Sequence, residues 1–182
     1  MLGTYDMDGT DDAIDCGQIA ALKGASSWTI SGWYNQTTLD QQRFLWGTFS
    51  SGTNMISAET WSDGQMYFEI RNGGSSYAQF DYSTVISAGT WFHIAMIFDG
   101  TESSDNDRLI AFINGSQVSL NYSAAAIPTT SNATQGNLWI ANNTNWNVEW
   151  LGGIGPVYIY NRNLLASEVL TNYNRLKSRF GL

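Results

Sequence analysis

The chain has 182 residues, the length of one domain that can bury a full hydrophobic core. It carries 8 Lys and Arg against 16 Asp and Glu, and the net charge of −8 argues against nucleic acid as a partner. No run of about 18 apolar residues is present, so we expect no membrane insertion. The start at Met1 lacks a signal peptide, which predicts synthesis in the cytoplasm, and the single Cys16 cannot form an internal disulfide.

Short runs rich in aromatic and β-branched residues alternate with tight-turn signals along the chain. The turn signals are Asp-Gly and Asn-Gly pairs, which supply positive φ angles, at residues 8–9, 63–64, 72–73, 99–100 and 114–115. The runs between them predict strands over 12–16, 28–35, 42–49, 54–59, 65–71, 76–81, 91–98, 108–113, 116–120, 137–142 and 148–160. An apolar stripe at helical spacing then predicts one helix over 166–176. This order predicts an all-β antiparallel sandwich in which residues 1–182 form a single domain.

Two of these segments are particularly informative. Residues 91–98 are apolar with few polar interruptions, as expected for a central strand covered on both faces. Asn114-Gly115 between two apolar runs predicts a tight hairpin. Most strand aromatics are core residues, and we expect this of Trp28, Trp33, Trp46, Trp91 and Trp139.

Four segments, in order, resemble those of laminin-G-like domains of the concanavalin A type. They are Asp8–Ile14 (DGTDDAI), Trp28–Trp33 (WTISGW), the pair Trp91–Gly100 (WFHIAMIFDG) and Leu109–Gly115 (LIAFING), and the closing Gly152–Leu164 (GGIGPVYIYNRNL) with its helix. The resemblance covers nearly the whole chain and implies an antiparallel β-sandwich jelly roll with one short C-terminal helix. It also implies a surface-binding module rather than an enzyme.

The final segment, Asn172–Leu182 (NYNRLKSRFGL), resembles the end of laminin-G-like domains in bacteriophage virion proteins. Two departures from the family pattern accompany it. Gly155-Pro156 stands where many members carry a pair of acidic residues, so a carboxylate that helps to hold calcium or tie the sheet edges is missing. Leu165 stands at the helix N-cap, which should cost about 1 kcal/mol unless Asn163 caps the helix instead.

Catalytic residues are not evident from the spacing of the acidic side chains. Glycoside hydrolases need two carboxylates that flank the scissile bond. The five glutamates, at 59, 69, 102, 149 and 168, form no closely spaced run along one strand, and the single His93 lies in mid-strand. The sequence therefore predicts no catalytic site, although a glycoside hydrolase or lyase remains an alternative.

Two acidic clusters are candidates for a metal site. Five aspartates lie between Asp6 and Asp15, and Glu102, Asp105 and Asp107 lie in one predicted loop. Calcium prefers six to eight oxygen ligands from carboxylates and carbonyls. No cofactor is required by the sequence; calcium is the metal that these residues suit, with Glu102, Asp105 and Asp107 as the better candidates. The alternative for the N-terminal cluster is a solvated turn in which Asp side chains cap backbone amides.

Aromatic rings among amides indicate where a sugar could bind. Trp146 and Trp150 lie in a segment that also contains Asn143 and Asn145, and Trp61 beside Asp63 offers a second position. Rings stack on sugar faces and amides bind hydroxyl groups. We therefore predict glycan contact by Trp146, Trp150, Asn143, Asn145 and Trp61, against the alternative that Trp146 and Trp150 are core or subunit-packing residues.

The preferred interpretation is a non-enzymatic bacteriophage virion surface protein, either a capsid decoration protein or a component of a tail or fibre. Its partners would be other virion proteins, cell-surface glycans or both, and we expect a homo-oligomer on the virion. The alternative is a free carbohydrate-binding lectin module, which would place the protein in the extracellular space.

Overall fold

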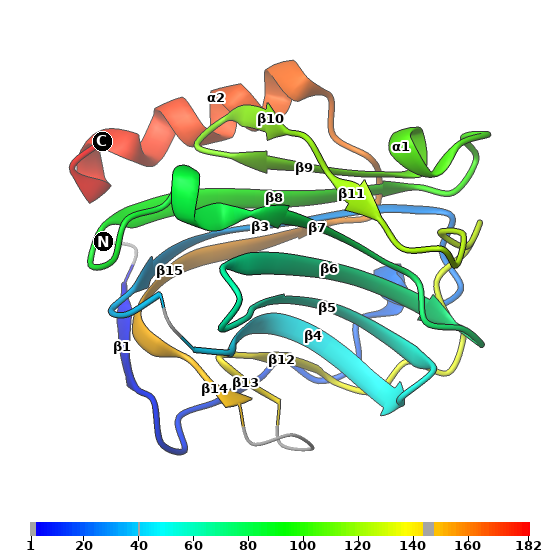
Figure 1. The fold of residues 1–182 in the computed structure, drawn as a ribbon, viewed down its shortest axis with the longest axis horizontal. Helices are drawn as coiled ribbons and strands as arrows, with labels where there is room; N and C mark the ends of the chain where they lie inside the picture. The colour runs from blue at the N-terminus through cyan, green and yellow to red at the C-terminus, as the bar shows by residue number, and fades with distance from the viewer. Residues whose placement is uncertain (1–2, 40, 144–147) are drawn as a thin grey trace.

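The computed structural model describes residues 3–39, 41–143 and 148–182, and two antiparallel sheets packed face to face dominate it (Figure 1). The first sheet has six strands. In spatial order they are β1 (Tyr5–Asp8), β15 (Leu151–Tyr160), β3 (Ser27–Gln36), β8 (Trp91–Asp99), β9 (Leu109–Ile113) and β10 (Ser116–Val118). The predicted antiparallel β-sandwich jelly roll is confirmed.

The second sheet has seven strands within the described ranges. In spatial order they are β11 (Asn121–Tyr122), β7 (Tyr77–Asp81), β6 (Gln65–Asn72), β5 (Asn54–Thr60), β4 (Arg43–Ser51), β12 (Leu138–Ile140) and β2 (Ile14–Asp15). A separate pair, β13 (Asn142–Asn143) and β14 (Val148–Glu149), lies beside β4. The short helices are α1 (Asp105–Arg108) and three 3₁₀ turns, Ala20–Leu22, Tyr82–Thr84 and Lys177–Phe180.

The main core fills the space between the two sheets. Alternate residues of each strand point into it, such as Trp28 and Ile30 of β3 and Phe68 and Ile70 of β6. Trp28 and Trp46 are fully buried there, whereas Trp91 and Trp139 are only half-buried, which corrects the prediction that both are core residues.

A second, smaller core lies on the outer side of the six-stranded sheet. There α2 (Ala166–Leu176) covers the sheet, as Figure 1 shows, and Val169 packs with Ala95, Ile97 and Phe112. The Trp33 ring lies in the same layer and stacks on the Phe180 ring at 4.3 Å between centroids. Strand β8 is thus covered on both faces, as its apolar sequence predicts.

The hairpin and the final helix form as predicted. Asn114 and Gly115 have φ angles of 50° and 79°, so both central residues adopt the left-handed conformation that the tight turn between β9 and β10 requires. The N-cap of α2 is Leu165, which makes no side-chain capping hydrogen bond, and the Asn163 side chain, two residues earlier, donates its amide to Asp99. Instead the Glu168 carboxylate accepts from the Leu165 N–H at 2.9 Å and satisfies one free donor.

Other predicted boundaries are wrong in instructive ways. The strand predicted over 148–160 is two strands, and at Gly155-Pro156 a bulge interrupts the pairing of β15 with β3. A side chain at Gly155 would lie 2.9 Å from both Trp33 and Phe180, so the bulge brings the backbone against the second core. Strand β1 was not predicted; it forms by pairing with β15. Within the described residues, no helix is both long and apolar enough to cross a membrane.

Candidate functional site

The outer face of the seven-stranded sheet carries an unusual set of side chains. In β6, Met66, Phe68 and Ile70 point into the main core, so the alternate residues Tyr67 and Glu69 lie on the opposite face. The register extends this face across the sheet: Glu59 of β5 opposes Tyr67, and Tyr77 of β7 opposes Glu69. This outer face therefore combines aromatic rings with two carboxylates.

Three aromatic rings form a continuous row on this face, which we call the aromatic row: Trp61, Tyr67 and Tyr77. The ring centroids of Trp61 and Tyr67 are 5.3 Å apart, and those of Tyr67 and Tyr77 are also 5.3 Å apart. Trp61 is 38% exposed and the two tyrosines are half-buried. Strands β6 and β7 and the turn before β6 thus present three rings to solvent, one of which, Trp61, is a residue that the sequence predicts to contact a glycan.

The turn between β5 and β6 holds the row in place. The backbone N–H of Trp61 donates to the Gln65 carbonyl at 2.8 Å, and the backbone N–H of Gly64 donates to the Trp61 carbonyl at 3.1 Å. The Asp63 carboxylate accepts from the Gln65 N–H at 3.0 Å and from the Tyr67 hydroxyl at 3.5 Å. The Asp63-Gly64 turn signal therefore fixes both the hairpin and the position of the exposed rings.

Glu59 and Glu69 lie beside this row on the same face, on adjacent strands at diagonal positions of the register. Burial and, to a smaller extent, the charge of Glu69 together raise the pKa of Glu59 from 4.5 to about 7, against the opposing effect of hydrogen bonds from Gln42 and Trp61. Burial also raises the pKa of Glu69, opposed by Arg71 and Ser57. Arg71 pairs with Glu69 at 2.5 Å, and the Gln42 amide donates to Glu59 at 2.8 Å.

Spacing along one strand does not reveal this pair, because Glu59 and Glu69 lie on two different strands. Glu59 and Glu69 flank the Asp63-Gly64 turn, and counting residues outward from that turn would have brought them together on one face. Carboxylates that cleave a glycosidic bond must both reach it. Glu59 is 1% exposed and Glu69 is 4% exposed, so the accessible part of this face is the aromatic row.

The other predicted glycan contacts lie elsewhere. Trp150 is 0% exposed and packs edge-on against Tyr34 in the main core, so its ring presents no face to a glycan. The indole N–H of Trp150 has no hydrogen-bond partner among the described residues. Asn143 belongs to β13, and its side chain is outside the described part of the structure, as are Asn145 and Trp146. The glycan contacts of these three residues remain predictions.

The predicted calcium ligands are not gathered into one site. Asp105 pairs with Arg108 at 3.6 Å and accepts from the Ile127 N–H at 3.0 Å. Asp107 accepts from the Ser104 hydroxyl at 2.6 Å, and Glu102 contributes its carbonyl to Arg108. These contacts hold the α1 loop together, whereas the prediction of calcium there rests on the sequence alone.

Carboxylates do gather in the N-terminal cluster. Ligand oxygens of Asp8, Asp11 and Asp12 all lie within 4.8 Å of one another. The Asp8 carboxylate accepts from the Thr10 N–H, and the Asp12 carboxylate accepts from the Asp8 N–H. This is the arrangement of a capped turn, which the sequence offered as the alternative to a metal site.

The sequence matches the laminin-G family of the Concanavalin A-like lectin/glucanases superfamily over residues 8–170. The chain belongs to this superfamily. Among curated proteins, none matches the chain significantly in sequence.

Solved structures of this fold include several proteins similar to the chain at low sequence identity. A sialidase carbohydrate-binding module (CBM40) from Ruminococcus gnavus, solved with α2,3 sialyllactose, has a TM-score of 0.66 and 13% identity, over 93% of this chain and 97% of that one. A heptameric SAP-like pentraxin from Limulus polyphemus has a TM-score of 0.64 and 14% identity, over 93% and 81%. The binding domain of botulinum neurotoxin serotype D has a TM-score of 0.68 and 12% identity, over 94% and 42%. At sequence identities this low, the similarity concerns the fold alone.

Proposed function

We propose that this chain is a non-catalytic, lectin-like binding module whose aromatic row contacts carbohydrate. The observation that carries the proposal is the row formed by Trp61 in the turn before β6, Tyr67 of β6 and Tyr77 of β7, partly exposed and fixed by the turn at Asp63-Gly64. Flat rings stack on the apolar faces of sugars at little entropic cost, because they have few rotatable bonds. The similar fold of a module solved with sialyllactose supports this proposal.

Binding fits this surface better than cleavage. The two carboxylates on the outer face are almost fully buried, and each already accepts hydrogen bonds from neighbouring side chains. A general acid or nucleophile needs direct access to the scissile bond. Glu59 and Glu69 instead orient Gln42, Trp61 and Arg71, which places them in support of the binding surface.

The test is binding of soluble oligosaccharides to the purified chain, measured by titration calorimetry across a panel of neutral and acidic glycans. We expect Trp61→Ala and Tyr67→Ala each to weaken binding by about fivefold or more, since a stacked ring contributes on the order of 1 kcal/mol. Tyr5→Ala is the matched control, because Tyr5 is an aromatic residue, 61% exposed, on β1 of the other sheet. Equal loss in all three variants, or no binding to any glycan, would contradict the proposal.

A second candidate function is that of a virion surface protein, which the resemblance of residues 172–182 to bacteriophage proteins favours. This segment contains Phe180, whose ring stacks on Trp33 beside the second core, so the segment is an integral part of the fold. A homo-oligomer on a particle would increase weak glycan binding through avidity, and the heptameric pentraxin of similar fold supports an oligomer. A virion surface protein would be located on the virion, whereas a free lectin would be located in the extracellular space.

Sedimentation of source material tests this second candidate. The virion proposal predicts that the chain co-migrates with megadalton particles in many copies. A free monomer or small oligomer would refute it and leave the lectin proposal standing. Binding measured with and without a calcium chelator tests the calcium prediction, which centres on Glu102, Asp105 and Asp107.

A further inference from the structure

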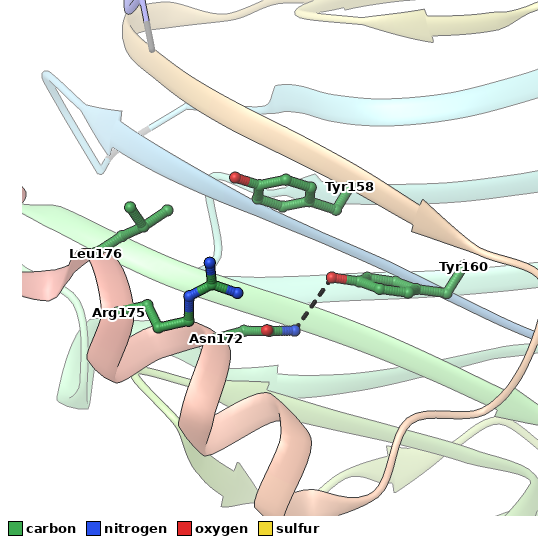
Figure 2. A pocket seen from close by; sticks show the side chains of 5 residues that line it. All are labelled: Tyr158, Tyr160, Asn172, Arg175 and Leu176. Atoms are coloured by element: carbon green, nitrogen blue, oxygen red, sulfur yellow. Dashed lines mark hydrogen bonds between the residues drawn. The ribbon is translucent and has the colours of Figure 1, made fainter. Parts of the chain in front are cut away.

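A hollow lies on the other side of the molecule from the aromatic row, between α2 and the outer face of β15 (Figure 2). We call it the helix groove. It is lined by Tyr158 and Tyr160 from the strand and by Asn172, Arg175 and Leu176 from the helix. Its volume is about 180 Å³, which equals about six water molecules at roughly 30 Å³ each. A single sugar ring or a similarly small molecule is the size of ligand that fits.

The groove exists because α2 covers only part of the six-stranded sheet. In β15, Val157 and Ile159 pack against the main core, so Tyr158 and Tyr160 point to the outer face. The helix packs over β8 and β9 through the second core and leaves the rings of β15 partly uncovered. Tyr158 is 36% exposed.

Several hydrogen-bond donors that face the groove are not used by any described residue. The Asn172 amide donates to the Tyr160 hydroxyl oxygen at 3.1 Å, which orients that phenol and leaves its own proton available (Figure 2). Arg175 is exposed and makes no hydrogen bond or ion pair to any described residue. The planar guanidinium carries five N–H donors in a geometry that matches a carboxylate.

The charge around the groove is opposite to that of the whole protein. The chain has a net charge of −8, yet Arg175, Lys177 and Arg179 lie within five residues, and Glu168 is the single acidic side chain after residue 160. Glu168 is paired with Arg162 at 2.7 Å. Lys177 and Arg179 lie over the rings of Tyr173 and Phe180, which leaves Arg175 as the cation that lines the groove.

We propose that the helix groove binds a carboxylated sugar. Arg175 would hold the carboxylate in a bidentate pair, the faces of Tyr158 and Tyr160 would contact the ring, and the phenol protons with the Asn172 amide would bind hydroxyl groups. The site is separate from the aromatic row, since it lies on the outer face of the opposite sheet, and it does not depend on glycan binding there.

The test is a two-dimensional NMR titration of the intact chain with glucuronate. Glucose, which has the sugar ring without the carboxylate, and acetate, which has the carboxylate without the ring, are the control ligands. We expect glucuronate to shift the signals of residues around Tyr158, Tyr160 and Arg175 at concentrations where neither glucose nor acetate does. Arg175→Gln should weaken glucuronate binding at least about tenfold, the effect expected from removing a charge-assisted bidentate pair. Arg179→Gln removes the same charge from the same end of the chain and should leave binding within about twofold.

Three results would overturn the proposal. Equal weakening by Arg175→Gln and Arg179→Gln would show attraction by overall charge without a defined site. Equal binding of glucose and glucuronate would remove the role of the carboxylate. Loss of glucuronate binding in Trp61→Ala, with Arg175→Gln unaffected, would place the ligand on the aromatic row. Retention of groove binding in Trp61→Ala, by contrast, keeps this proposal distinct from the proposed function.

Discussion

Replacing Glu59 with glutamine should make the protein less sensitive to alkaline pH. In the folded state the pKa of Glu59 is raised from 4.5 to about 7 by burial and by the charge of Glu69. Since the folded pKa exceeds the unfolded one, the stability that this group contributes is complete below pH 4.5 and is lost as the pH rises through about 7. At 1.36 kcal/mol for each pH unit, the ionised carboxylate lowers the free energy of unfolding by about 3 kcal/mol in total, of which about 2.5 kcal/mol falls between pH 5 and 8.

Urea denaturation at pH 5 and pH 8 measures this effect. The glutamine side chain in Glu59→Gln keeps an oxygen that can accept the hydrogen bond from Gln42, so the variant should fold. We expect the stability of Glu59→Gln relative to the natural protein to improve by about 2 to 3 kcal/mol between pH 5 and pH 8. Because the comparison is made at each pH, contributions from titrating groups that do not interact with Glu59 cancel.

Glu168→Gln is the control for this comparison. Hydrogen bonds from Arg162 and from the Leu165 N–H hold the pKa of the Glu168 carboxylate at about 2. The stability that Glu168 contributes is therefore lost only as the pH falls below 4.5, the pKa of this group in the unfolded chain. The difference in stability between Glu168→Gln and the natural protein should thus stay nearly constant between pH 5 and 8. A Glu59→Gln difference that stays constant within about 0.5 kcal/mol would refute the view that this carboxylate is desolvated beside the aromatic row.

Three further predictions concern packing and acid stability. Burial lowers the pKa of His93 from 6.5 to about 4, so the stability that neutral His93 contributes is complete above pH 6.5 and is lost as the pH falls. In urea denaturation, the free energy of unfolding of His93→Phe should therefore rise by about 3 kcal/mol relative to that of the natural protein between pH 7 and pH 4. A difference between the two proteins that does not change with pH would contradict this. Phe180→Ala removes the ring stacked on Trp33 and should lower the free energy of unfolding, measured by thermal or urea denaturation, by about 3 kcal/mol. A loss below about 1 kcal/mol would show that the C-terminal segment contributes little to stability. Gly115→Ala should lower the free energy of unfolding more than Gly73→Ala does. Both glycines have φ near 80°, but only at Gly115 would the new methyl group lie 3.0 Å from Leu170 and Tyr173. Equal losses of stability in the two variants would contradict the packing of α2 on this hairpin.

The strands and the hairpin were predictable because their signals are local. The apolar run Trp91–Phe98 and the Asn114-Gly115 turn each specify their conformation within a few residues. Strand β1 has no such signal, since three of its four residues are exposed, and it is ordered by its pairing with β15.

The candidate site was less predictable, because it depends on which strands are neighbours and which face each residue takes. Trp150 follows a short strand and precedes Gly152, whose φ of 129° breaks the alternation, so counting along the chain could not place its ring. Glu59 and Glu69 are ten residues apart in sequence and meet only through the hairpin register. Trp61 could be singled out because an aromatic residue beside a turn is more often exposed than one in mid-strand.

The central claim is that this surface binds carbohydrate without cleaving it. The most direct measurement follows one glycan mixture with the natural protein, recording bound ligand by calorimetry and new reducing ends over many hours. We predict saturable binding that Tyr67→Ala weakens, with reducing ends no higher than in buffer alone. Reducing ends that accumulate with the natural protein and stop accumulating in Glu59→Gln or Glu69→Gln would contradict the account and identify the buried carboxylate pair as catalytic.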